Sequence, residues 1–190
     1  TKSDIESALW RGANTFRGII DAANYKDYVL SMLFVKYLSD TYTENLNDLK
    51  DKYNDEARLE RAKSRLPFVL QEEQTFDYLY DNRYDSEIGQ KINAALRAIE
   101  DNNAQLQGVF RSVDFNSEAN LGNSKQKATT LRNLLEDFKP LDLRPSMIEV
   151  KENQVASDVL GDAFEYMIGE FASQAGKKAG SFFTPMMVSE

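Results

Sequence analysis

The chain has 190 residues and a formal net charge of −8, and 42% of its residues are hydrophobic, which is enough for one domain with a sizeable core. It contains no cysteine and no histidine, which excludes disulfides, thiolate metal sites and the most common general base, and it has no run of about 18 apolar residues that would span a membrane. The negative charge disfavours non-specific DNA binding by the whole chain, but it still allows a local basic patch or a partner that contacts the DNA.

The first third of the sequence predicts two helices. Ser3 and Glu6 have the spacing of a capping box that opens the first helix, which we expect to end near Gly18. Its apolar residues share one helical face: Ile5, Leu9, Ala13 and Phe16. Asn24 is a plausible N-cap for the second helix, whose middle is apolar nearly all round, so we expect it at the centre of the core. Its apolar positions are Tyr25, Tyr28, Val29, Met32, Leu33, Phe34, Val35, Tyr37 and Leu38.

Residues 57–65 form the most basic stretch of the chain. A solvated helical face is the ordinary interpretation of such a stretch, and a contact with phosphate groups is the sharper alternative. Pro67 is expected to end this helix. The DNA-binding candidates are the basic residues of this stretch and two lysines near the end of the chain: Arg58, Arg61, Lys63, Arg65, Lys177 and Lys178.

The middle of the chain predicts further helices separated by irregular segments. An aromatic cluster among acidic residues is typical of a core or a protein interface rather than a base-stacking surface: Phe76, Tyr78, Leu79, Tyr80 and Tyr84. An amphipathic helix over 88–99 follows and ends at 101–103. Residues 106–121 predict an irregular, partly buried segment in which a short strand is an option. Ser124 is expected to cap the next helix, which carries Ala128, Leu131, Leu134, Leu135 and Phe138 on its apolar face.

The last long helix is predicted over 155–173 and should end at Gly176. Its apolar residues recur every four positions, so the stripe winds around the helix, and we expect Leu160 and Phe164 to be buried. Asp158 and Asp162 lie one turn apart, and we interpret them as a solvated face because no third type of metal ligand is near. Strand-type alternation is scarce, so the sequence predicts an all-α fold with irregular connections.

The final segment, Gly180-Ser181-Phe182-Phe183-Thr184-Pro185, predicts the start of another helix. Thr184 suits the N-cap and Pro185 the first helical position. A helix start offers unpaired N–H groups and a positive dipole end, so it suits a carboxylate or phosphate, but a plain loop-to-helix junction remains the alternative. Because this element begins so close to Glu190, we interpret the chain as an N-terminal fragment of a longer protein.

Several stretches in order resemble the N-terminal region of the modification subunit of type I restriction–modification systems. They are Asp21-Ala22-Ala23-Asn24-Tyr25-Lys26-Asp27-Tyr28-Val29-Leu30, Phe34-Val35-Lys36-Tyr37-Leu38-Ser39-Asp40, Ile88-Gly89-Gln90-Lys91-Ile92-Asn93, Leu106-Gln107-Gly108-Val109-Phe110, Leu160-Gly161-Asp162-Ala163-Phe164-Glu165-Tyr166 and the final segment above. The family consists of DNA adenine-N6 methyltransferases that use S-adenosylmethionine. The resemblance covers nearly the whole chain.

The resemblance implies a helical N-terminal domain over 1–175, followed by a linker and the first, truncated part of a Rossmann-like methyltransferase domain over 176–190. In this family the Phe-Thr-Pro segment belongs to the cofactor pocket, near the methionine end of the methyl donor. It therefore implies these cofactor-binding residues: Ser181, Phe182, Phe183, Thr184, Pro185 and Met186. The implied partners are the specificity subunit, a second modification subunit, the restriction subunit and, through the complex, DNA. The implied location is the cytoplasm.

Two motifs of the family's catalytic machinery are missing from these 190 residues. No Gly-rich loop follows a strand, and no Asn/Asp-Pro-Pro-aromatic tetrad occurs, although the family uses that tetrad to hold the flipped adenine. We therefore predict no catalytic residue and no metal ligand in this chain, and no methylation of DNA by the fragment alone. A stand-alone helical protein-interaction module with no role in methyl transfer is the alternative.

Overall fold

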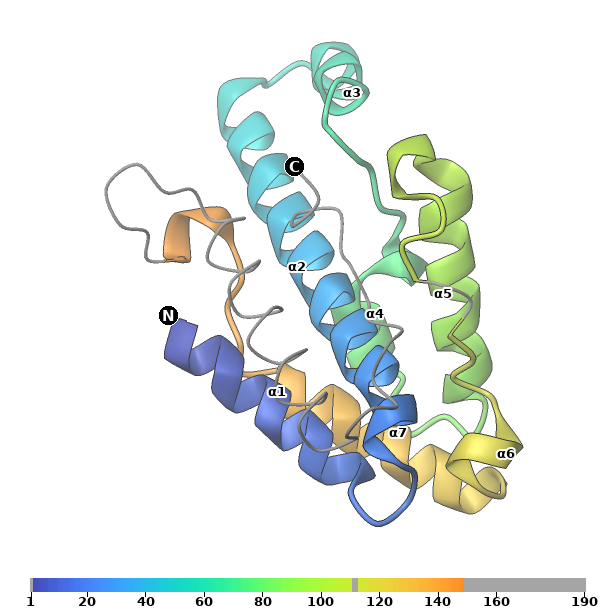
Figure 1. Ribbon diagram of the computed structural model, residues 1–190. Coiled ribbons are helices and arrows are strands. Elements are labelled where there is room, and N and C mark those ends of the chain that lie inside the picture. The colour runs from blue at the N-terminus through green and yellow to red at the C-terminus, as the bar shows by residue number, and fades with distance from the viewer. Residues whose placement is uncertain (1, 111–112, 149–190) are drawn as a thin grey trace.

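The computed structural model describes residues 2–110 and 113–148, and every regular element in these ranges is a helix (Figure 1). The α-helices are α1 (Lys2–Phe16), α2 (Ala22–Lys52), α3 (Glu56–Lys63), α4 (Phe76–Asp81), α5 (Ile88–Asn102), α6 (Glu118–Leu121) and α7 (Ser124–Phe138). Two single 3₁₀ turns lie between these helices, at Glu72–Gln74 and Ala104–Leu106, and a third, at Pro145–Met147, follows α7. The all-α prediction is confirmed, since no strand occurs in the described ranges.

The long helix α2 passes through the centre of the domain, as its nearly continuous apolar middle predicts (Figure 1). Its residues Val29, Leu30 and Leu33 are completely buried. Helix α7 is the second organising element, because it contacts α1, α2, α4, α5 and α6. Although α2 has 31 residues, no described helix is long and apolar enough to cross a bilayer.

The predicted apolar faces are confirmed. On α1 the face is Ile5, Leu9, Ala13 and Phe16, on α5 it is Ile88, Ile92, Ala95, Leu96 and Ile99, and on α7 it is Leu131, Leu134, Leu135 and Phe138; all of these residues are buried. Ala128, also predicted on the apolar face of α7, is half-buried. Burial of a stripe at 3.6-residue spacing is the main source of stability for such amphipathic helices. The periodicity of the sequence therefore gave the correct inward side of each helix.

Three predicted helix starts are wrong by one to three residues. Helix α1 begins at Lys2, one residue before Ser3, a difference within the normal uncertainty of helix ends. Helix α2 starts at Ala22 because Asp21 adopts the extended backbone of an N-cap, so Asn24 lies within the first turn. Asn123 rather than Ser124 caps α7, because its side chain accepts the N–H of Gln126 at 3.0 Å while the Gln126 side chain accepts the N–H of Asn123 at 2.9 Å.

Helix α3 also ends earlier than predicted. Its last residue is Lys63 and its C-cap is Ser64, so the helix stops before Pro67 can interrupt it. The Ser64 hydroxyl donates to the carbonyl oxygen of Arg61 at 2.6 Å, and this bond competes with continuation of the helix.

The irregular segment between α5 and α7 supplies part of the core. Phe110 packs against Phe34 of α2 with ring centroids 5.9 Å apart, and Phe115 meets Tyr28 edge-on at 5.1 Å. These four rings are buried. The described residues of this segment form turns and the short helix α6, and the short strand that the sequence allowed is not among them. The prediction of an irregular, partly buried segment is confirmed.

Candidate functional site

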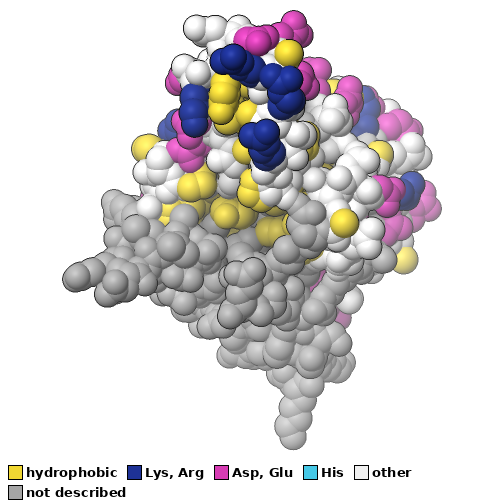
Figure 2. All heavy atoms as spheres, turned by 90° about the horizontal axis from the view of Figure 1, so that it is seen from above, with side chains coloured by type: hydrophobic (Ala, Val, Ile, Leu, Met, Phe, Trp, Pro, Cys, Tyr) yellow, Lys and Arg dark blue, Asp and Glu magenta, His cyan; other side chains and the backbone are white. Residues whose placement is uncertain are grey.

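The strongest basic surface lies where α2 ends and α3 follows, and we call it the basic tip. It consists of Lys50, Lys52, Arg58, Arg61, Lys63 and Arg65, with Asp51, Asp55, Glu56 and Glu60 among them. Figure 2 looks down on this end of the molecule and shows lysine and arginine side chains gathered there, with acidic side chains at the margin. Sequence reasoning found the four residues around α3 but missed Lys50 and Lys52, which lie in the last turn of α2.

Two of the four predicted DNA contacts that lie within the described residues are already paired with carboxylates. Arg58 Nε lies 3.8 Å from Asp55 Oδ2, and Lys63 Nζ lies 3.2 Å from Glu60 Oε1. Arg61 and Arg65 are exposed, and neither has a carboxylate within ion-pair distance in the ranges that the structure describes. Among the predicted contacts of this tip, phosphate binding would therefore rest mainly on these two arginines.

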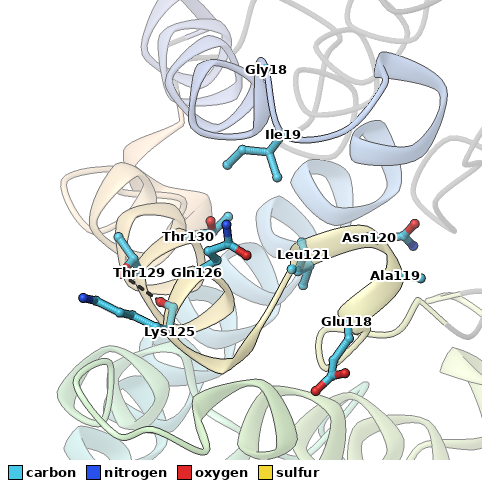
Figure 3. Close-up of a pocket in the computed structure, with 11 residues that line it drawn as sticks. Gly18, Ile19, Glu118, Ala119, Asn120, Leu121, Lys125, Gln126, Thr129 and Thr130 are labelled. Atoms are coloured by element: carbon cyan, nitrogen blue, oxygen red, sulfur yellow. Dashed lines mark hydrogen bonds between the residues drawn. The ribbon is translucent and has the colours of Figure 1, made fainter.

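A cavity of about 570 Å³ opens between the α1–α2 turn, α6 and the first half of α7 (Figure 3). Ile19 approaches it from the turn, while Lys125 and Thr129 come from α7, where the Thr129 hydroxyl donates to the Lys125 carbonyl oxygen at 3.0 Å. Glu118 and Lys125 are its only ionisable lining residues, and both are exposed. The cavity therefore lacks the desolvated ionisable groups that acid–base catalysis uses.

One of the stretches that resemble the modification subunits contains a buried ion pair. Lys36 Nζ donates to both carboxylate oxygens of Asp40, at 2.8 and 2.7 Å, and both side chains are largely shielded from water. Asp40 also accepts the backbone N–H of Leu143 at 2.8 Å, so one carboxylate ties α2 to the segment after α7. Burial raises the pKa of Asp40, and the ion pair with Lys36 opposes this only in part.

Sequence reasoning missed this pair, although a signal for it was present. Opposite charges four residues apart meet on one helical face, and in α2 they occur within a strongly apolar stretch. Such a pair is buried together with its helix, unlike the same pair on a polar helix.

Other stretches that resemble the modification subunits connect α2 and α5 to residues 114–115. The Tyr28 hydroxyl donates to the Asp114 carbonyl oxygen at 2.7 Å. Asn93 donates to Asp114 Oδ1 at 2.8 Å and accepts the backbone N–H of Phe115 at 2.8 Å. Gly89 allows the close approach of this segment, because a Cβ there would lie 2.6 Å from the Phe115 carbonyl oxygen. These residues join structural elements and carry no reacting group.

The predicted cofactor residues 181–186, the two lysines Lys177 and Lys178, and the predicted helix with Leu160 and Phe164 lie outside the described residues. Within the described ranges, no group of three or more carboxylates that could hold a metal ion occurs. The described part of the chain is therefore a helical scaffold with a basic tip and an open cavity.

Comparison with known families places two models in order along the chain. Residues 5–138 match the HsdM N-terminal domain, and residues 155–190 match the N-6 DNA Methylase family. The first match covers all seven described helices apart from the first residues of α1.

Known proteins with similar sequences are methylase subunits. The chain is 28% identical over its whole length to the type I restriction enzyme MpnII methylase subunit of Mycoplasma pneumoniae, of which it covers 38%. It is 23% identical over 98% of its length to the MjaIX methylase subunit of Methanocaldococcus jannaschii, of which it covers 34%. The chain thus spans between a third and two-fifths of the length of these relatives.

A solved structure shares the fold. The crystal structure of a type I restriction-modification system methyltransferase subunit from Streptococcus thermophilus superimposes with a TM-score of 0.69 and 28% sequence identity, covering 98% of this chain and 42% of that one. The helical architecture, the ordered family matches and the relatives agree with one another. The chain belongs to the family of HsdM N-terminal domains of type I restriction–modification methylase subunits, and its last residues begin an N-6 DNA methylase domain.

Proposed function

We propose that the chain is the N-terminal part of an S-adenosylmethionine-dependent DNA adenine-N6 methyltransferase subunit that works in a cytoplasmic type I restriction–modification complex. The observation that carries the proposal is the order of the two family matches, a helical domain over 5–138 followed by the start of a methylase domain at 155. The full-length subunit performs the methyl transfer, and these 190 residues alone are inactive.

The role of the helical domain is assembly. It packs on the catalytic domain that follows, contacts the specificity subunit, the restriction subunit or a second modification subunit, and helps the complex to close around DNA. Two features favour this role over catalysis: the described cavity lacks desolvated acids and bases, and the buried polar groups serve as structural joints.

The cofactor segment belongs to the following domain. Residues 181–186 form one wall of the S-adenosylmethionine pocket, with Thr184 as the N-cap of a helix whose first N–H groups face the carboxylate of the methyl donor. The remaining walls come from the methylase domain beyond Glu190.

The test uses the full-length subunit together with its specificity subunit. Transfer of a labelled methyl group from S-adenosylmethionine to adenine in duplex DNA is expected for this complex and not for residues 1–190. A shortened variant of the subunit that lacks residues 1–148 should still bind S-adenosylmethionine, and this binding would show that its catalytic domain is folded. It should fail to assemble with the specificity subunit and to methylate DNA. Normal assembly and methylation by this shortened subunit would contradict the assembly role.

A further inference from the structure

The residues that follow α7 run beside α2, in the same direction as that helix (Figure 1). We call residues 139–148 the strap. Its apolar residues Leu141, Leu143 and Ile148 are buried, so the chain does not leave the helical domain at the end of α7. It stays in contact with the domain up to Ile148.

Two carboxylates of α2 hold the backbone of the strap. Asp40 Oδ2 accepts the N–H of Leu143 at 2.8 Å, and Glu44 Oε2 accepts the N–H of Ser146 at 3.2 Å. Asp40 and Glu44 are four residues apart, so they face the strap from the same side of α2. Hydrogen bonds to an ionised acceptor are stronger than those between neutral groups. These bonds therefore attach the strap to α2 at two successive points.

Lys36, one turn before Asp40, orients the first of these carboxylates. Its ammonium group donates to both oxygens of Asp40 and lies 5.2 Å from the ring centroid of Phe76 in α4. The bond from Leu143 to Asp40 is partly buried. A buried N–H that loses its acceptor costs more free energy than the bond itself contributes. Release of the strap from Asp40 is therefore unfavourable.

The strap packs less closely against α1 than against α2. A cavity of about 450 Å³ lies between them, with Ser7 and Arg11 of α1 and Leu141 and Met147 of the strap among its lining residues. Met147 is 52% exposed. Attachment of the strap therefore depends on its contacts with α2 more than on its contacts with α1.

The strap occupies most of the connection between the two family matches. The first match ends at residue 138 and the second begins at residue 155, so residues 139–154 connect them. If this whole connection were free, it could reach about 55 Å when fully extended, whereas residues 149–154 alone can reach only about 20 Å. Attachment to α2 thus removes more than half of the possible reach between the two domains.

We propose that the strap fixes the point from which the methylase domain follows the helical domain, and that Asp40 and Glu44 are the positioning residues that hold it. The proposal rests on the proposed function, because it requires a methylase domain after the strap. A released strap leaves a longer tether, so the methylase domain samples more orientations relative to the helical domain. The alternative is ordinary packing of a domain end that has no effect on the next domain.

The experiment compares the full-length subunit with four variants. Glu44→Ala removes the second attachment point. The triple variant Lys36→Met, Asp40→Leu and Glu44→Ala removes both points and leaves no buried charge unpaired. Glu44→Gln keeps an oxygen acceptor and should behave like the wild type. Asp48→Ala, at an exposed position one turn beyond Glu44 in α2, is the matched control and should also behave like the wild type.

The first readout is amide hydrogen exchange in peptides that cover the strap, with peptides from α5 as the internal reference. Exchange should become about tenfold faster or more over residues 141–148 in the triple variant, and about threefold faster or more over residues 145–148 in Glu44→Ala. Peptides from α5 should exchange at the wild-type rate in both variants.

The second readout reports the position of the methylase domain. X-ray scattering should give a larger radius of gyration for the triple variant than for the wild type, and an intermediate value for Glu44→Ala. With the specificity subunit present, kcat for methyl transfer should fall by about tenfold or more in the triple variant, because misplaced reacting groups react slowly. The affinity for S-adenosylmethionine should stay unchanged, because the cofactor segment 181–186 is not altered.

Two results would overturn the proposal. Unchanged exchange in the strap of both variants would mean that Asp40 and Glu44 do not hold it. Faster exchange with a wild-type radius of gyration and kcat would mean that the strap is ordinary packing. If α5 of the triple variant also exchanges faster, its fold is damaged, and Glu44→Ala decides by the same two criteria. An inactive wild-type complex counts against the proposed function alone, because exchange and scattering still test the strap.

Discussion

Lys36 and Asp40 form an ion pair that is unusual for its position in the core rather than for its spacing. Exposed pairs four residues apart on a helix contribute only about 0.3–0.5 kcal/mol, because water screens them. Here both side chains are largely buried, and burial raises the pKa of Asp40 because its carboxylate is poorly solvated. Lys36 is the group that keeps this carboxylate ionised in the core, so the pair is sensitive to its loss.

We predict that Lys36→Met lowers the stability of the chain in a pH-dependent way. The folded-state pKa of Asp40 is already above its unfolded value of about 3.9, and removal of Lys36 raises it further. A raised folded pKa gives stability that is present below the unfolded pKa and is lost as the pH rises through the folded pKa. The loss of folding free energy relative to wild type should thus be small near pH 4 and should reach about 2–3 kcal/mol at neutral pH. This loss is limited because Asp40 can take up a proton.

Urea unfolding of both proteins between about pH 4 and pH 7.5 measures this difference. Lys63→Met, which removes an exposed pair with Glu60, serves as the control and should change stability by less than about 0.5 kcal/mol at any of these pH values. A loss of stability in Lys36→Met that is largest at acidic pH would show that the Asp40 carboxylate does not cause the destabilisation.

Residue-level prediction from the sequence succeeded where spacing decides and failed where side-chain contacts decide. The buried positions Ile5, Leu9 and Phe16 follow from helical periodicity alone. The N-cap residues do not follow from the sequence. Asp21, Asn24 and Asn123 are all acceptable cap residues, and only the backbone course of the folded chain selects between them.

The approach of α5 to residues 113–116 depends on the absence of a side chain at Gly89. Glycine in a helix costs about 1 kcal/mol relative to alanine, so a helical glycine needs a packing reason. A Cβ at Gly89 would lie 2.6 Å from the Phe115 carbonyl oxygen. That carbonyl cannot move away easily, because the N–H of the same residue is bound to the Asn93 side chain of α5. Gly108 meets a different requirement, a left-handed backbone with φ of +76°.

We predict that Gly89→Ala destabilises the chain by about 1–2 kcal/mol, because the cost of overpacking exceeds the gain in helix propensity. Gln90→Ala, the next residue of α5 and exposed, should change stability by no more than about 0.5 kcal/mol. Thermal and denaturant unfolding of both variants tests this. A stabilised Gly89→Ala variant would mean that the 113–116 segment can move away from α5 at little cost.

At the level of elements, the sequence predicted which segments are helical but not how they meet. Periodicity reports the apolar side of a single helix, whereas the cavity of Figure 3 combines the α1–α2 turn with α6 and α7, about a hundred residues further along the chain. The contact of the Arg132 guanidinium with the Tyr84 ring likewise joins α7 to the turn after α4. Such long-range combinations leave no periodic signal in one sequence.

The distribution of charge over the whole molecule limits its affinity for DNA. The chain carries −8 overall, and its basic tip contains four carboxylates beside six basic residues. We predict that residues 1–190 bind duplex DNA only weakly, with a dissociation constant above about 1 µM at physiological salt. Titrations at low and physiological salt test this, and sub-micromolar binding at physiological salt would contradict it.

Any DNA binding that does occur should depend unequally on the predicted contacts. The double variant Arg61→Ala with Arg65→Ala should flatten the salt dependence more than Arg58→Ala with Lys63→Ala, because Arg58 and Lys63 are paired with Asp55 and Glu60. Equal effects of the two double variants would mean that these exposed ion pairs open at no cost when DNA binds.

Residues 181–186 are expected to supply only one part of the cofactor site of the full-length subunit. One helix start and the lysines Lys177 and Lys178 should contribute about 1–2 kcal/mol toward the carboxylate of S-adenosylmethionine, whereas a complex with a dissociation constant of ten micromolar needs about 7 kcal/mol. We therefore expect no calorimetric binding of S-adenosylmethionine to residues 1–190 and clear binding to the full-length subunit.

In the full-length subunit, Thr184→Ala and Pro185→Ala should each weaken cofactor binding and leave the melting temperature of the unliganded protein nearly unchanged. The reason is that the N-cap and the first helical position orient the N–H groups that face the carboxylate, without contributing large apolar surface. Phe183→Ala is the informative comparison, since an apolar ring at that position would lower both affinity and stability if it packs as core and mainly affinity if it lines the pocket. Unchanged affinity in both Thr184→Ala and Pro185→Ala would remove residues 181–186 from the cofactor pocket, while the family assignment of the helical domain over 5–138 would stand on its own match.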